Sequence, residues 1–297
     1  MPIRPPPRTV LNAAASNVLR ELIETERMYV NDLHHLLLHY RRPLELELAQ
    51  LGESKAMLNN GDMSAIFGNV AQVLKAHQEL LNSLDEKQAM ESFAHSFGEM
   101  MPFLKGIYTV YVQNYPLALS TLAKCTKSKQ KFANFISGVS QSKNCPDLES
   151  YLIKPVQRLC KYPLFMKQLL DIVSKEENQE HLKRIISEAS AAVNKVATEV
   201  NLQQRDAART VRGNYLAGGA FEGLPRSLCE PGRTYLDEFV CEVTRTTNEA
   251  FTQPASKVKV WYGFLFSDAL VFAKKAINTD KYKFRAWIDL ELSLIHI

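Results

Sequence analysis

Residues that commonly perform covalent chemistry are present in this sequence, but not in the groupings that such chemistry requires. The five cysteines are scattered, and no two have the CxxC spacing of a metal or redox site. The sequence holds no glycine-rich phosphate loop, no evident nucleophile–base pair and no cluster of metal ligands. Hydrolase chemistry is therefore unsupported, and we expect neither a cofactor nor a bound metal.

Composition narrows the class of protein further. The 297 residues suit about two domains, and a hydrophobic content of 46% lets each bury a core. No apolar run reaches the length of about 20 residues that crosses a bilayer, and the N-terminus lacks the apolar block of a secretory signal. The net charge of +4 is mild, and nucleic acid binding requires a denser basic stripe. We therefore expect a cytoplasmic protein that does not bind nucleic acid.

The texture of the sequence changes near Gly213. Residues 1–11 are rich in proline and arginine and are predicted to be a disordered leader. Residues 12–210 have helical patterning, with proline, glycine and asparagine concentrated at breaks. Beyond this point glycines accumulate, and short runs of β-branched and aromatic residues follow. The sequence therefore predicts an all-helical domain followed by a β domain.

Apolar residues at helical spacing predict six helical stretches in the first domain. Ser16 is expected to cap the first helix, Asp62 or Ser64 the second, and Pro116 suits the first turn of a new helix. Pro155 and Pro163 each remove a backbone donor, so we expect a break or kink in the fifth stretch. The stretches together predict an elongated helical bundle. They are residues 16–40, 64–84, 93–115, 129–140, 148–173 and 180–209.

The second domain is predicted to contain four strands. Tyr235, Phe239 and Val243 suggest the first strand, and the fourth has alternating residues. Ser267–Asp268 forms a tight turn between the second and third. An antiparallel meander is the simplest arrangement for strands joined by short connections. The predicted strands are residues 234–246, 257–266, 269–274 and 281–290.

Three segments of the helical half resemble the Dbl homology domain of Rho guanine-nucleotide exchange factors. They are residues 21–33 (ELIETERMYVNDL), 111–119 (YVQNYPLAL) and 148–164 (LESYLIKPVQRLCKYPL). The third match is long enough to be very specific, and the order and separation of all three fit the family. The resemblance implies an elongated all-α Dbl homology bundle over residues 12–210.

The second half is similar to the pleckstrin homology domain that usually follows. Residues 261–272 look like the second and third strands of that domain, and residues 282–288 look like the fourth. The remaining strands and the C-terminal helix of the family are absent, which leaves an apolar end and a sheet edge exposed. We therefore expect a linker at 211–233, an incomplete antiparallel β domain at 234–291 and a non-native tail at 292–297.

The resemblance implies an exchange factor, which makes and breaks no covalent bond. Such a protein promotes GDP release from a Rho-family small GTPase because it binds the nucleotide-free state far better than the GDP-bound state. The family pattern assigns Glu21 to switch I of the GTPase, and Lys161 and Asn201 to switch II. Glu24 and Glu26 are competing choices for the acidic residue. Because the three residues lie on different helices, the bundle must bring them to one face.

The resemblance also implies residues that contact a partner without driving exchange. Ile153 lies where the family meets a GTPase residue that differs among Rho, Rac and their relatives, although a buried isoleucine is an equally good interpretation. Gln157 and Arg158 follow one turn later, and Arg158 has the alternative of pairing with a carboxylate inside the bundle. In the β domain, Lys257 and Lys259 are candidates for binding a phosphoinositide membrane.

Two other functions remain open from the sequence. The first is a catalytically inactive scaffold that binds GTPases or membranes, against which the three matching polar positions argue. The second is a helical membrane-curving adaptor, which needs a basic face along the bundle. The first helix is instead rich in acidic residues, which disfavours an adaptor.

Overall fold

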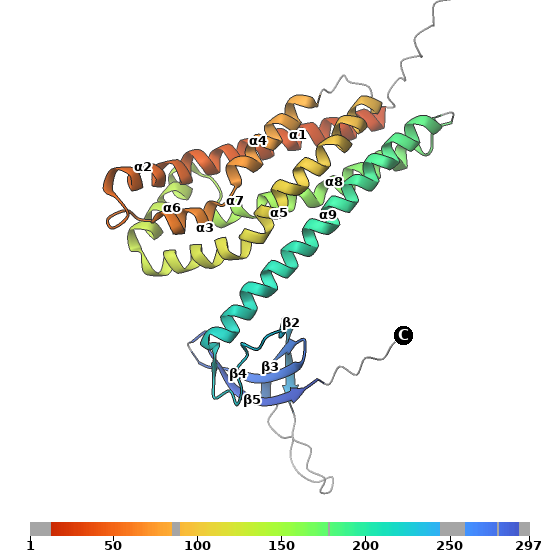
Figure 1. The fold of residues 1–297 in the computed structure, drawn as a ribbon. Helices are drawn as coiled ribbons and strands as arrows, with labels where there is room; N and C mark the ends of the chain where they lie inside the picture. The colour runs from red at the N-terminus through yellow and green to blue at the C-terminus, as the bar shows by residue number, and fades with distance from the viewer. Residues whose placement is uncertain (1–12, 85–89, 178, 244–258, 278, 291–297) are drawn as a thin grey trace, which may run out of the picture. The chain divides into compact units, whose positions relative to one another are not determined.

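The computed structural model of the chain describes residues 13–84, 90–177, 179–243, 259–277 and 279–290. The described residues form two compact units that divide after Arg205. The first unit is helical, and the second contains a five-stranded sheet (Figure 1). The predicted order, an all-α bundle followed by an antiparallel β domain, is therefore confirmed.

Within the described residues, ten helical segments precede the second π-helix and the sheet. α1, the π-helix η1 and α2 follow one another without a break, whereas a separate short helix, α7, leads into α8. Their bounds are α1 (Ala13–His35), η1 (Leu36–Arg41), α2 (Arg42–Leu51), α3 (Asn60–Phe67), α4 (Val70–Ser83), α5 (Met90–Ser128), α6 (Gln130–Lys143), α7 (Leu148–Leu152), α8 (Lys154–Val173) and α9 (Glu180–Tyr215).

The buried stripe of α1 shows how the helical core forms. Leu19, Leu22, Glu26, Tyr29 and Leu33 recur at intervals of three or four residues, so they lie on one side of the helix, and all five are buried. Four are apolar or aromatic and join the core of the first unit. The fifth is a carboxylate, which has to find partners within the core because water cannot reach it.

Two predicted helix starts are wrong. Ser16 lies inside α1, which begins no later than Ala13. The second stretch is two helices, α3 and α4, because Gly68 has a φ of +44° and ends α3. The cap of α3 is the Asn59 side chain, whose Oδ1 accepts from the backbone N–H of Asp62 at 2.7 Å. Neither Asp62 nor Ser64 caps it.

The prolines act differently from one another. Pro155 lies in the first turn of α8, and the helical structure is interrupted just before it at Ile153, as predicted. Pro163 and Pro116 instead lie inside α8 and α5, so the prediction that Pro116 starts a new helix is wrong. Long helices tolerate an internal proline where tertiary packing holds both sides of it.

The second unit begins inside the last helix. α9 continues to Tyr215, past the predicted end at Arg209, and is followed by the π-helix η2 (Leu216–Ala220) and β1 (Phe221–Glu222). Helix and strand thus occupy the first part of the segment expected to be a linker. The other strands are β2 (Tyr235–Val243), β3 (Lys259–Phe266), β4 (Ala269–Lys275) and β5 (Tyr282–Asp289).

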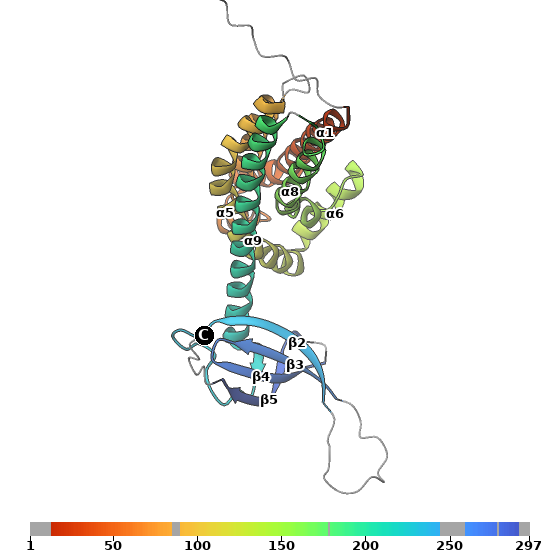
Figure 2. The same ribbon diagram turned by 90° about the vertical axis from the view of Figure 1, so that its right-hand side faces the viewer.

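The sheet has the order β1-β5-β4-β3-β2 (Figure 2). β2 to β5 form the predicted antiparallel meander, and β1 adds a short parallel pair with β5 that the sequence did not indicate. One face of the sheet carries Phe264, Phe266 and Val271, which pack in a second core with Leu216. The predicted strand ends at 244–246 and 257–258 lie outside the described residues.

Two glycines allow the same substitution to be tested with opposite expected signs. A Cβ at Gly68 would meet the Asn114 amide nitrogen at 2.8 Å, and the positive φ is strained for alanine. We expect Gly68→Ala to destabilise the helical unit by about 1 kcal/mol or more. Gly106 lies within α5 and a Cβ there meets nothing within 4 Å, so Gly106→Ala is expected to stabilise by about 0.5–1 kcal/mol. Chemical denaturation followed by helical circular dichroism measures both, and equal shifts would contradict this account of the α3–α4 break.

Candidate functional site

The exposed residues of interest depend on the pairing of α1 with α8. Lys154 Nζ lies 2.6 Å from Asp32 Oδ2, and further along both helices Arg158 Nη2 lies 2.6 Å from Glu26 Oε2. Residue numbers rise on one helix while they fall on the other, so the two helices are antiparallel. Figure 2 shows them side by side. Two ion pairs from the same two helices fix their relative register.

Glu26 is the centre of a buried polar network. Its side chain is 0% exposed, and that of Arg158 is 3% exposed. Arg158 donates to Glu26 Oε2 from Nε at 2.8 Å and from Nη2 at 2.6 Å, and the Tyr162 hydroxyl donates to the same oxygen at 2.8 Å. His77 Nδ1 lies 2.6 Å from Glu26 Oε1, and its Nε2 lies 2.8 Å from the Tyr108 hydroxyl. The network therefore joins α1, α4, α5 and α8.

Electrostatics keep Glu26 ionised despite its burial. Burial alone would raise the pKa of Glu26, but attraction to His77 and Arg158 and the hydrogen bonds they make outweigh it, so that pKa lies below its ordinary value. Burial, followed by the negative charge of Glu26, raises the pKa of Tyr162. The tyrosine therefore stays a hydroxyl donor, and both carboxylate oxygens of Glu26 are hydrogen bonded.

A second stripe of α1, made of exposed and half-buried residues, lies beside α8. Glu21, Thr25, Met28 and Asp32 are spaced by four, three and four residues, so they share one side of the helix. The last three line a cavity of about 230 Å³, and Met28 is 60% exposed. Lys161 lines the same cavity from α8, together with Lys154, Gln157 and Arg158. Glu21 is exposed one turn before Thr25, at the end of this stripe.

α9 adds the third predicted residue. Asn201 Oδ1 accepts a hydrogen bond from Cys160 Sγ at 3.5 Å, and Cys160 directly precedes Lys161. Lys161 is exposed, whereas Asn201 is half-buried. Thus the bundle brings Lys161 and Asn201 to neighbouring positions, with the Glu21 stripe on the other side of the shared cavity. We call this set of exposed and half-buried residues of α1, α8 and α9 the α1–α8–α9 face; it consists of Glu21, Thr25, Met28, Asp32, Gln157, Lys161 and Asn201.

The three residues with predicted contact roles differ in accessibility. Gln157 is exposed and lies on the α1–α8–α9 face. Ile153 is partly buried and packs against the helical core, so it has both an accessible and a core side. The Arg158 guanidinium donates hydrogen bonds to Glu26, Thr25 and the Leu22 carbonyl. Arg158 thus pairs with a carboxylate inside the bundle, the second of the two roles that the sequence left open.

Sequence reasoning missed several residues of this region. Met28, Leu164 and Leu202 are large, apolar and more than half exposed, and they lie on α1, α8 and α9 respectively. The spacing of Met28 seven residues after Glu21 was a usable signal, because that interval returns to nearly the same side of a helix. The position of Glu26 on the apolar stripe of α1 was another, because it distinguishes a buried partner of Arg158 from an exposed carboxylate.

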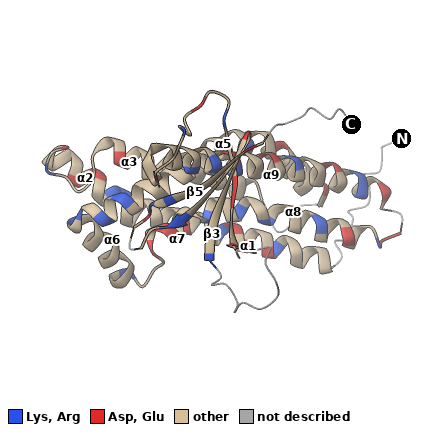
Figure 3. Cartoon of the chain, turned by 90° about the horizontal axis from the view of Figure 1, so that it is seen from below, with Lys and Arg blue, Asp and Glu red and all other residues tan. Residues whose placement is uncertain are grey.

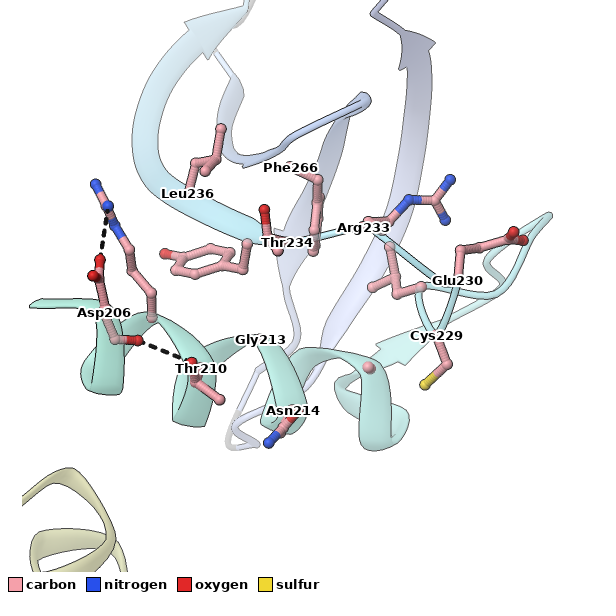
Figure 4. Close-up of a pocket in the computed structure, with 14 residues that line it drawn as sticks. Asp206, Thr210, Gly213, Asn214, Cys229, Glu230, Arg233, Thr234, Leu236 and Phe266 are labelled. Atoms are coloured by element: carbon pink, nitrogen blue, oxygen red, sulfur yellow. Dashed lines mark hydrogen bonds and ion pairs between the residues drawn. The ribbon is translucent and has the colours of Figure 1, made fainter. Parts of the chain in front are cut away.

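The second unit has its own candidate features. Lys259 is exposed at the start of β3, opposite Val243 of β2, and Lys257 lies outside the described residues. Figure 4 shows a cavity of about 550 Å³ between the end of α9 and β2. Its two arginines already have partners: Arg209 lies 3.6 Å from Asp206, and Arg233 lies 2.8 Å from Asp268. Neither arginine of the cavity thus offers an uncompensated positive charge to a phosphate.

The described residues contain neither grouped metal ligands nor a membrane-spanning helix. No group of three or more histidine, cysteine, aspartate or glutamate side chains there could hold a metal ion. None of the helices in the described part of the chain is both long and apolar enough to span a membrane.

Comparisons with known proteins converge on one family. The family model for the RhoGEF domain matches residues 18–201. Pleckstrin homology domain-containing family G member 3 from Homo sapiens is 31% identical over 267 residues, which cover 90% of this chain and 20% of that protein. Rac guanine nucleotide exchange factor B from Dictyostelium discoideum is 26% identical, covering 94% of this chain and 25% of that protein. The chain thus spans a quarter or less of the length of these two relatives.

Solved structures share the fold. The complex of the PDZ-RhoGEF DH/PH domains with GTP-γ-S activated RhoA has a TM-score of 0.68 at 15% identity, covering 93% of this chain and 78% of that chain. The linker-DH/PH domains of p115-RhoGEF have a TM-score of 0.67 at 17% identity, covering 93% and 82%. At this identity the likeness shows the fold, that of DH/PH modules.

The buried ion pair can be tested by removing one partner and then both. Arg158→Leu leaves Glu26 in the core without its guanidinium, and we expect a loss of about 3–5 kcal/mol in the free energy of unfolding. Replacing both residues by leucine removes the uncompensated charge, so the double variant is expected to be more stable than Arg158→Leu alone. Denaturant titration of the three proteins measures this, and a double variant that is less stable than the single one would contradict a charge-compensation role.

The same pair predicts how stability depends on pH. The pKa of Glu26 is lowered in the folded protein, so its contribution is complete above the ordinary pKa of 4.5 and is lost as the pH falls through the lower folded value. We therefore expect wild type to lose more stability below pH 4.5 than the Glu26→Gln variant does. Thermal melts across this range measure the difference.

Proposed function

Because the chain belongs to the RhoGEF domain family, we propose that it is a guanine-nucleotide exchange factor that promotes GDP release from a Rho-family small GTPase. The names of its relatives, among them a Rac guanine nucleotide exchange factor, support this class of substrate. No covalent bond is made or broken by the chain in this proposal.

The observation that carries the proposal is the composition of the α1–α8–α9 face. An exposed ammonium (Lys161) lines the cavity between α1 and α8, and an exposed carboxylate (Glu21) lies one turn before Thr25 of the same cavity. An amide (Asn201) on α9 contacts Cys160, the residue before Lys161. A carboxylate accepts hydrogen bonds from backbone N–H groups and hydroxyls, an ammonium donates, and an amide does both. Together they suit a partner surface of irregular backbone, such as the two switch segments of a GTPase.

The mechanism is differential binding. The exchange factor binds the nucleotide-free GTPase more tightly than the GDP-bound form, and so shifts the population toward nucleotide loss. In this proposal Glu21 engages switch I, and Lys161 and Asn201 engage switch II. Each contact that favours the empty state by about 1.4 kcal/mol contributes roughly tenfold to release.

We propose that exposed apolar residues of α1, α8 and α9 add affinity. Met28 lines the same cavity as Lys161. Leu164 lies three residues after Lys161 on α8, and Leu202 directly follows Asn201 on α9. Each is more than half exposed, and burying it against a partner removes apolar area from water. An apolar core with polar residues at its rim is typical of protein–protein interfaces.

Glu21 gives the sharpest test of the exchange function. We expect Glu21→Ala to reduce GDP release to the uncatalysed rate, because it removes the acceptor for switch I, while circular dichroism stays unchanged. Lys161→Ala and Asn201→Ala are expected to give smaller reductions, of about tenfold each. Release of a fluorescent GDP analogue from a panel of Rho-family GTPases measures the rates.

Glu24→Ala is the matched control, because Glu24 is also an exposed glutamate on α1. We expect it to retain exchange activity. Equal rates above background for wild type and Glu21→Ala would refute the assigned mechanism. If GTPases bind but none releases GDP faster than alone, the chain is a scaffold.

Ile153 is proposed to influence the choice among GTPases. Removing one methylene with Ile153→Val changes the shape offered to a partner and is expected to alter the ratio of rates on two GTPases by about tenfold or more. Ile172→Val is the control, since Ile172 is also a partly buried isoleucine packed on the core. It should show a similar stability change without a change in the ratio. If Ile153→Val and Ile172→Val change the ratio of rates equally, the change comes from lost stability and not from the choice of GTPase.

A further inference from the structure

One segment of the helical unit has an unusual charge composition. Between Glu99 and Asp147 the sequence holds six lysines and no aspartate, glutamate or arginine. This segment contributes +6, so the rest of the chain, whose total is +4, carries −2. The positive charge of the protein is therefore concentrated on α5, α6 and the turn between them.

The structure shows which of these lysines are accessible. Lys105 is paired with Glu199, and Lys129 lies 2.6 Å from Asp62. The other lysines of the segment are exposed: Lys124, Lys127, Lys131 and Lys143. Lys124 and Lys127 lie in the last two turns of α5 and Lys131 in the first turn of α6, so the three surround one corner, here named the lysine corner. In Figure 3, blue marks both lysine and arginine, and blue segments lie on and near α6.

The acid beside the lysine corner is already neutralised. The Lys129 hydrogen bond lowers the pKa of Asp62, burial opposes it, and the positive charges of Lys129 and then Lys124 lower it further. Asp62 is therefore ionised and balances one lysine. α6 itself contains no acidic residue along its whole length. Lysines therefore outnumber acidic residues between Glu99 and Asp147 and along the whole of α6.

Exposed apolar residues continue along the same line of α5. Phe103, Val110 and Leu117 are 50%, 51% and 47% exposed, and they lie seven residues apart. Lys124 is the next position at this interval. Because seven residues are nearly two full turns, the four side chains follow one slowly drifting line on the helix. A line of half-exposed apolar side chains that ends among lysines suits a surface that is itself apolar and anionic.

We propose that the lysine corner and the adjoining apolar line of α5 form a binding surface for an anionic lipid membrane. Lysines near an anionic bilayer gain from its negative surface potential, and apolar side chains beside them enter the interface. The absence of arginine from this segment favours a lipid surface over a phosphorylated peptide. Phosphate recognition by proteins commonly uses the bidentate fork of arginine, whereas lysine acts as a point charge. An acidic protein segment is the competing occupant.

The surface is separate from the exchange site. It involves neither Glu21, Lys161 nor Asn201, and it does not require Lys257 or Lys259 of the second unit. Membrane binding can therefore be measured on the chain alone, without a GTPase, and its outcome does not depend on whether the chain catalyses exchange.

Vesicle sedimentation of the full chain tests the proposal. Wild type is expected to bind phosphatidylserine–phosphatidylcholine vesicles and not pure phosphatidylcholine vesicles, and to dissociate as salt is raised. Replacing Lys124, Lys127 and Lys131 together by glutamine should weaken binding about a hundredfold, at a factor of about five for each lysine. Leu117→Ser should weaken it by roughly fivefold. The matched control replaces Lys75, Lys167 and Lys175, which are exposed elsewhere on the helical unit, by glutamine and should bind like wild type.

Three outcomes would overturn the proposal. If wild type does not bind the anionic vesicles, the membrane surface is excluded. If the two triple variants lose vesicle binding equally, binding depends on the net charge of the chain and not on the lysine corner. A loss produced by Lys257→Gln with Lys259→Gln, but not by the lysine-corner variant, assigns lipid binding to the second unit. If wild type binds a polyglutamate peptide but no vesicles, and the lysine-corner variant binds neither, the occupant is an acidic protein. Gel filtration and circular dichroism of each variant exclude misfolding.

Discussion

The buried pairing of Glu26 with Arg158 is the constraint on which the arrangement of the helical unit depends. An ionised carboxylate in an apolar core is costly unless its oxygens are hydrogen bonded and its charge is balanced. Both conditions are met by residues from α4 and α8, and α5 is linked through Tyr108 and His77. Any shift of α1 against α8 would separate these groups. The network therefore selects one register between the two helices.

That register decides what reaches the surface. With Glu26 facing inward, Thr25, Met28 and Asp32 of α1 face α8 across a small cavity, and Glu21 is exposed one turn before Thr25. The register thereby sets Lys161 beside this stripe, while the Cys160–Asn201 contact brings in α9. A buried interaction that touches no partner thus positions the groups proposed to touch one. In the proposed function, Arg158 is a positioning residue and Glu21 a contacting one.

Much of the fold was predictable because hydrophobic periodicity and turn chemistry are local. The two-domain order, most helices and the β2–β5 meander followed from the spacing of apolar residues and from Ser267–Asp268. The errors had two different causes. Pro116 lies inside a continuous helix, where packing on both sides overrides its local preference. Gly68 ends α3 with the positive φ that glycine adopts readily, a local signal that the apolar pattern across the break concealed.

The sequence by itself determined the fold class and, through three matching segments, which polar residues to consider, because motif residues and helical periods are written in order along one chain. It left open whether Glu26 of α1 faces outward and whether Arg158 meets a partner or a carboxylate. Only the tertiary structure decided these points, by burying Glu26 against Arg158 and leaving Glu21 exposed. It also assembled lysines of two helices into one corner. The physical reason is that burial and charge balance are properties of side chains brought together in space by the packing of separate helices.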